Sequence, residues 1–335
     1  AVASRLRGGE LAAAATTTGL VGSAVSLTKN ILGIGVMTLA AGMAAGTGVG
    51  PATLAMVLTT VAAAYSFTLL GDACELSGLG AACSFEGLWV ATLGARTDWL
   101  VNAAIGSLTF SICAVYLICL GELLPPLLTL MRAPLSLRSR RASIMLAAAA
   151  TFPLCLPSLA GLSFVSLLGV GAICFTAFFS VLRWRDGSYA EGGRFHAKMP
   201  PALRPRLGDV HPWALTDQSA VLLANLGVAL CAHFNAPGFY RALTDASASR
   251  FRWMSALAFG LVLVLSVLIA HPGYFTFGSA CQPLILNNYH PTEDPLATAA
   301  RAATVASLCC SFPLAFAALR EAFLAAFGPL FARAV

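Results

Sequence analysis

The sequence predicts an all-α protein that crosses a lipid bilayer several times. Three observations carry this prediction: 58% of the 335 residues are hydrophobic, only 10% are charged, and the mean hydropathy is +0.82. Soluble domains usually have about 25% charged residues, which cover their surface. The composition therefore excludes an ordinary soluble enzyme, a disordered chain and a collagen-like fibre, and predicts a polytopic protein in contact with lipid.

The length and the spacing of apolar runs predict eight membrane spans. A spanning helix needs about 20 mainly apolar residues, which leaves room for roughly eight to ten spans. The apolar runs cover residues 19–46, 51–70, 98–130, 143–156, 162–182, 217–240, 253–277 and 296–327. The remaining segments are a polar head (1–18), a semi-polar stretch (77–97), an Arg-rich segment (132–141) and a hydrophilic loop (183–212).

Charge and cysteine content point to no nucleic acid and to no metal site. The formal net charge is +6, but the basic residues are spread over several loops. Seven of the ten cysteines are scattered through the apolar runs, and the sequence has no C-x-x-C pair and no matching His/Cys spacing. We interpret them as small packing residues. The first apolar run is too long and too rich in glycine for a signal peptide.

Counting positive charges in the loops predicts one orientation. The Arg-rich segment carries four basic residues and the hydrophilic loop carries six. Cytoplasmic loops are enriched in Lys and Arg. This count alone places both loops in the cytoplasm and the N-terminus outside.

Two predicted spans contain helix-breaking residues in mid-membrane. The first span has Gly33 and Gly35, and the sixth has Pro237 and Gly238. Unwound backbone at membrane depth is tolerated where it is buried in protein or lines a cavity. Interruptions at corresponding places in two repeats indicate the binding site of a transporter. The alternative is that these glycines only allow close helix packing.

Lys29 is an ionisable residue inside the first span. Such residues are costly in a membrane and are functional candidates by default. Its ammonium group is a candidate for proton coupling or for replacing a cation; the alternative is a lysine that snorkels to the interface. Ser307 and Ser311 share one helical face and are candidate Na⁺ ligands together with first-span carbonyls. Alternatively, Ser311 bonds the carbonyl four residues earlier.

Further polar residues lie near the two interruptions. His233 and Asn235 come just before Pro237, where they are candidates for reading a substrate or relaying a proton. A structural hydrogen bond between helices is the competing interpretation. Glu122 lies near one end of its span, where we expect it to face the interface.

Several motifs in the same order resemble the amino acid/auxin permease family, which includes sodium-coupled neutral, proton-coupled and vacuolar amino acid transporters. SAVSLTKNILGIGVMTLAAGMAAGTG is similar to the first helix of this family, with Asn30 and Gly33-Ile34-Gly35 at the unwound segment. YLICLGELLPPLL, which includes Tyr116, resembles the end of the third helix. AHFNAPGFYRAL resembles the sixth helix, and GYFTFG resembles the end of the seventh. Leu39-Ala40 departs from the usual Leu-Pro.

The resemblance implies a five-plus-five inverted-repeat (LeuT-like) fold that transports amino acids by alternating access. Residues 19–182 would form the first repeat, and residues 213–335 an incomplete second repeat, which makes the chain two helices short of the fold. The implied topology has a cytoplasmic N-terminus, in conflict with the charge count. The implied substrate site consists of Asn30, Gly33, Gly35, Tyr116, His233 and Asn235.

The sequence therefore predicts a secondary active transporter for neutral amino acids, coupled to Na⁺ or H⁺. It needs no cofactor, is not an enzyme, and lies in the plasma membrane or a vacuolar or lysosomal membrane. One rival is a transporter-like sensor that binds an amino acid and signals without transport. Another is an inactive, truncated relative. The spans contain no H-E-x-x-H motif and no paired aspartates, so no catalytic group is evident.

Overall fold

The computed structural model describes residues 17–80, 83–155, 163–205 and 208–331. The described part is almost entirely helical; its only β contact is an isolated bridge between Thr18 and Leu243. Six helices are long and apolar enough to cross a membrane, and a seventh span results if one bent helix pair is counted as a unit. This architecture agrees with the predicted polytopic helical membrane protein.

The first span is broken where the sequence predicts. Helix α2 (Leu20–Ile31) is followed by a 3₁₀ turn, η1 (Ile34–Thr38), and by α3 (Leu39–Ala44), with a bend of 50°. We refer to these elements as the first broken span. Gly35 is required here because a Cβ atom on it would lie 2.7 Å from the Cα of Ala229. The glycine thus allows two backbones to approach closely.

Three long helices follow the predicted runs. Helix α4 covers Val49–Leu76, α6 covers Asp98–Leu130 and α8 covers Ser163–Arg185. The semi-polar stretch contains a short helix, α5 (Phe85–Leu93), that was not expected. It starts at an N-cap, because the Ser84 hydroxyl accepts a hydrogen bond from the Gly87 amide at 2.9 Å.

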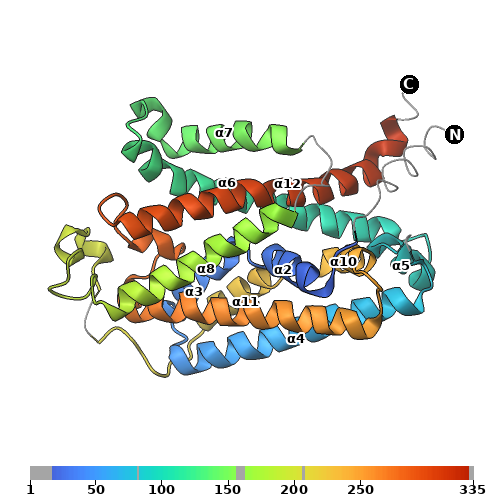
Figure 1. Cartoon of the computed structure of the whole chain (residues 1–335), viewed down its shortest axis with the longest axis horizontal. Coiled ribbons are helices and arrows are strands. Elements are labelled where there is room, and N and C mark those ends of the chain that lie inside the picture. The colour runs from blue at the N-terminus through green and yellow to red at the C-terminus, as the bar shows by residue number, and fades with distance from the viewer. Residues whose placement is uncertain (1–16, 81–82, 156–162, 206–207, 332–335) are drawn as a thin grey trace.

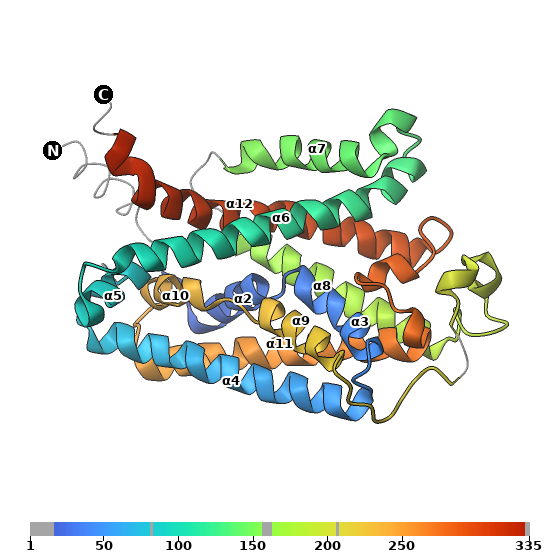
Figure 2. The ribbon, with the colours of Figure 1, turned by 180° about the vertical axis from the view of Figure 1, so that it is seen from behind.

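The predicted fourth span is a short helix in the structure. Helix α7 (Arg140–Thr151) has 12 residues and continues as a 3₁₀ turn, η4 (Phe152–Cys155). At 1.5 Å per residue, α7 covers about 18 Å of a hydrocarbon core about 30 Å thick. It lies along α6 at the edge of the molecule (Figures 1 and 2). The described residues therefore form up to seven candidate spans where the sequence predicts eight.

The sixth predicted span is broken earlier than expected. Helix α9 (Ser219–Ala229) ends before a 3₁₀ turn, η7 (His233–Asn235), and α10 (Ala236–Ala242) follows. These elements form the second broken span. Pro237 lies in the first turn of α10 instead of at the break. The reason is that proline has no amide hydrogen to lose there and its φ angle suits a helix start.

The last two spans are long continuous helices. They are α11 (Ala248–Phe277) and α12 (Pro295–Phe331). A polar connection with two 3₁₀ turns, η8 (Gly278–Ala280) and η9 (Ile285–Asn288), joins them. The hydrophilic loop between α8 and α9 holds the short turns η5 (His196–Lys198) and η6 (Pro201–Leu203).

Both broken spans lie inside the bundle. The ribbon shows them between a pair formed by α4 and α11 and a pair formed by α6 and α12 (Figures 1 and 2). Leu27, Val36 and Met37 of the first broken span are fully buried. Large apolar side chains point outward from the long helices, for example Leu54, Val61, Phe110 and Val264. Such an apolar exterior matches contact with lipid.

Candidate functional site

The two broken spans meet at their interruptions. Gly35 of the first span packs against Ala229 at the end of α9. Beside this contact, the Asn235 side-chain amide donates a 3.0 Å hydrogen bond to the Asn30 side-chain oxygen. Two residues that the sequence places near separate breaks, 205 positions apart, are therefore direct partners.

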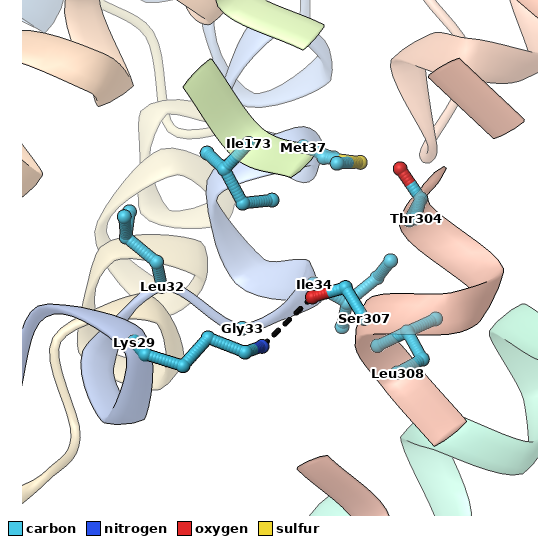
Figure 3. A pocket seen from close by; sticks show the side chains of 9 residues that line it. All are labelled: Lys29, Leu32, Gly33, Ile34, Met37, Ile173, Thr304, Ser307 and Leu308. Atoms are coloured by element: carbon cyan, nitrogen blue, oxygen red, sulfur yellow. Dashed lines mark hydrogen bonds between the residues drawn. The ribbon is translucent and has the colours of Figure 1, made fainter. Parts of the chain in front are cut away.

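Lys29 is the charged residue at the centre of this region. Its side chain is buried, and its Nζ donates to the Ser307 hydroxyl at 2.8 Å and to the Ser311 hydroxyl at 2.5 Å. The first of these bonds is drawn in Figure 3. Lys29 therefore does not snorkel to an interface but joins α2 to α12. Its ammonium group donates hydrogen bonds to the two hydroxyls that the sequence predicts as Na⁺ ligands.

Ser311 also makes the local bond that the sequence left open. Its hydroxyl donates to the backbone oxygen of Ser307 at 2.9 Å, four residues earlier. A hydroxyl can donate one proton and still accept. Ser311 therefore makes both bonds at once, and its local bond orients the lone pairs that accept from Lys29.

A pocket lies between the breaks. Its polar lining consists of Lys29, Asn30, Tyr116, Asn235 and Ser311. Its apolar walls are Ile112, Cys231, Phe234, Leu314 and Ala315. The pocket leaves about 30 Å³ for the centres of water-sized molecules, which is room for a few waters. We name it the central pocket.

Asn30 holds an unused donor at the central pocket. Its oxygen accepts from Asn235, but its Nδ2 is buried and has no hydrogen-bond partner among the described residues. Buried amide donors are almost always paired in folded proteins. The free donor is therefore suited to a ligand that brings an acceptor, such as a carboxylate.

A second, smaller pocket adjoins the central pocket and shares Lys29 with it. It is lined by Lys29, Leu32, Gly33, Ile34, Met37, Ile173, Thr304, Ser307 and Leu308 (Figure 3). It leaves about 10 Å³ for the centres of water-sized molecules, close to the room that one water needs. We name it the lysine pocket. Gly33 lines it, whereas Gly35 lines neither pocket.

His233 is not brought to either pocket. Its Nε2 faces α4, where it lies 2.8 Å from the Ser66 hydroxyl and 3.2 Å from the Ala63 carbonyl oxygen. Its ring packs edge-on against Phe67. His233 thus forms a hydrogen bond between two helices, which is the alternative to a substrate role that the sequence left open. The break precedes His233 and turns its side chain toward α4.

Sequence reasoning missed a buried ionic cluster at the start of α12. The Asp294 carboxylate is fully buried and accepts from Arg183 Nε at 2.8 Å and from Arg183 Nη2 at 2.6 Å. Tyr189 of the hydrophilic loop donates to the same carboxylate at 3.0 Å. Burial and the negative charge of Asp294 raise the pKa of the Tyr189 hydroxyl. The cluster anchors the loop to the bundle.

Other polar residues have structural partners. Glu122 accepts from Asn287 at 3.0 Å and lies 3.6 Å from Arg140 at an end of α6, as expected for an interfacial residue. Arg301 is buried and donates to three carbonyl oxygens in and after η9. In the described ranges, no three His, Cys, Asp or Glu side chains gather in a way that would hold a metal ion.

Comparison with known proteins adds one match. The family model described as transmembrane amino acid transporter protein matches residues 16–330, nearly the whole chain. No curated protein matches the sequence.

Proposed function

Because the chain belongs to the transmembrane amino acid transporter family, we propose that it imports or exports a neutral amino acid in symport with protons. Proteins of this family move amino acids across membranes and are not enzymes. Alternating access would centre on the two broken spans, with the amino acid in the central pocket between them.

The observation that carries this proposal is the unused Asn30 donor at a pocket between two interrupted helices. An α-carboxylate would accept from Asn30 Nδ2 and from the Tyr116 hydroxyl, which lies against Gly33. Carbonyl oxygens freed at the second break would accept from the α-ammonium group.

The lining of the central pocket supports a neutral, mainly apolar substrate side chain. Ile112, Phe234 and Leu314 form its walls, and none of the described residues that line it has a carboxylate to pair with a cationic side chain. Its one charged group, Lys29, is held by two serines. A free amino acid is larger than the few waters that fit, so binding requires the helices around the pocket to separate, as alternating access demands.

The lysine contacts support protons over sodium as the coupling ion. A Na⁺ ion at Ser307 and Ser311 would lie beside the Lys29 ammonium. Two positive charges at such a short distance repel each other strongly where water is scarce. A protonated lysine holds α2 to α12 through both hydroxyls. Loss of its proton removes the charge from this contact and frees the first broken span to move.

Transport by purified protein in proteoliposomes tests the proposal. We expect a radiolabelled neutral amino acid to accumulate when an inward proton gradient is imposed. A sodium gradient should not change its uptake. Asn30→Ala should lower uptake about tenfold or more, the effect of a lost hydrogen bond to a charged group. Asn102→Ala on α6, which lines neither pocket, is the matched control and should leave uptake unchanged.

Three outcomes would contradict parts of this proposal. Binding of the amino acid without uptake under either gradient would favour a sensor. Uptake driven by sodium alone would reject proton coupling. Uptake that is unchanged in Asn30→Ala would reject the central pocket as the site.

A further inference from the structure

The lysine pocket contains an ammonium group without a counter-ion. Lys29 is buried, and no carboxylate lies within ion-pair distance of it among the described residues. Its two hydrogen-bond partners, Ser307 and Ser311, are neutral. A buried charge with only neutral partners is costly, because no opposite charge is near enough to compensate for the loss of its water shell.

Thr304 is a second unsatisfied group at the same pocket. Its side chain is 1% exposed, and its hydroxyl has no hydrogen-bond partner in the described part of the chain. Thr304 precedes Ser307 by three residues and shares its face of α12. Figure 3 shows both side chains on the side of α12 that faces Lys29 and the first break. A buried hydroxyl aimed into a pocket calls for a ligand.

The direction of the hydrogen bonds indicates the charge of that ligand. Ser307 accepts from Lys29, so its own proton is free to be donated. No acceptor for that proton is found among the described residues, and Thr304 has a free proton as well. Two hydroxyl donors next to an ammonium favour an anion over a cation. The other walls, such as Met37 and Ile173, are apolar and suit a weakly hydrated ion.

We propose that the lysine pocket binds one small monovalent anion of chloride size between the Thr304 and Ser307 hydroxyls, beside the Lys29 ammonium. The room for about one water excludes larger anions, and a chloride ion is only slightly larger than a water molecule. The anion supplies the missing counter-charge and the missing hydrogen-bond acceptor. The site rests on these buried groups alone and does not require the proposed amino acid substrate.

Thermal unfolding of the purified protein, without any amino acid, tests this site. Potassium chloride is compared with potassium gluconate at equal ionic strength. We expect Tm to be about 2–4 °C higher in chloride, rising to a plateau, as for a ligand at roughly ten times its Kd. Potassium bromide, whose anion is larger than chloride, should give a smaller shift of Tm. Equilibrium dialysis with radioactive chloride should find one ion per chain.

Three variants separate this site from other effects. Thr304→Val keeps the side-chain shape and should lose the chloride-dependent shift. Thr304→Ser restores the hydroxyl and should keep it. Thr109→Val on α6 removes another buried hydroxyl, away from both pockets, and should also keep it.

Two results would overturn the proposal. Equal Tm values in chloride and gluconate, with no chloride retained on dialysis, would mean that water fills the pocket. A chloride shift that persists in Thr304→Val would place the ion elsewhere. If Thr304→Val does not fold, the dialysis of the wild-type protein and of Thr304→Ser still decides between these results.

Discussion

The position of Lys29 depends on a glycine on a neighbouring helix. Gly169 of α8 lies directly against the lysine stem, and a Cβ atom there would collide with Lys29 Cε. The ammonium end cannot simply swing away, because two serines hold it. The absence of one methyl group therefore determines whether Lys29 reaches α12.

Replacing this glycine should uncouple transport without unfolding the protein. We expect Gly169→Ala to displace Lys29 and to lower proton-driven uptake about tenfold, the loss of one charged hydrogen bond. Gly171→Ala, two residues along α8, is the matched control because a Cβ atom there meets nothing within 4 Å. It should leave uptake unchanged. Equal uptake in both variants would show that the position of Lys29 does not matter.

Helix α12 has an anchored start and a polar face in its middle. At its start, Asp294 Oδ1 accepts from the amides of Leu296 and Ala297 at 3.1 and 3.4 Å, as an N-cap does. Further along, Thr304, Ser307 and Ser311 face the first broken span. The ionic cluster at Asp294 thus holds the helix that presents these hydroxyls, and it also ties down the hydrophilic loop.

Neutralising this buried carboxylate should lower stability strongly. Asp294→Asn removes the buried charge partner of the Arg183 guanidinium, whose side chain is 11% exposed, and leaves it only the more exposed Asp186 at 2.8 Å. Breaking a buried pair costs about 3–5 kcal/mol, so we expect a clear drop of Tm in thermal unfolding.

The neighbouring residue offers the control for this prediction. The exposed Glu293 pairs with Lys198, whose hydrogen bond lowers the pKa of the Glu293 carboxyl. Surface pairs of this kind contribute little, so Glu293→Gln should leave Tm unchanged. Similar Tm values for the two variants would show that the Asp294 cluster is not an anchor.

For the molecule as a whole, Lys29 is a connection between the first broken span and the outer helices. The two interruptions contact each other, and residues of both line the central pocket. Alternating access needs one group of helices to move against another. A contact that depends on a proton, placed between the two groups, would couple this movement to a proton gradient.

Neutralising Lys29 should abolish proton-driven accumulation of the amino acid but not its exchange across the membrane. In Lys29→Gln we expect exchange of amino acid across the membrane to persist while accumulation under a proton gradient is lost. The chain has one other lysine, Lys198 in the hydrophilic loop, so Lys198→Gln is the natural control and should accumulate substrate normally. Undiminished accumulation in Lys29→Gln would exclude this residue from coupling.

Local sequence features predicted much of this molecule. The bounds of α6 follow from the apolar run between Asp98 and Leu130, and the first break follows from Gly33 and Gly35. The second break was displaced by several residues, because Pro237 starts a helix here and does not interrupt one. The inverted repeat and the division of the chain at residues 182 and 213 stay predictions.

The sequence by itself determined that the chain lies in a bilayer, which residues form its long helices, and that two of its spans are interrupted. These features follow from apolar runs and glycines, whose effects are local. Only the tertiary structure decided that Lys29 meets Ser307 and Ser311, that Asn30 meets Asn235, and that His233 turns to α4. These partners lie between 167 and 282 positions apart. No local pattern encodes such pairs, since they depend on how the helices pack.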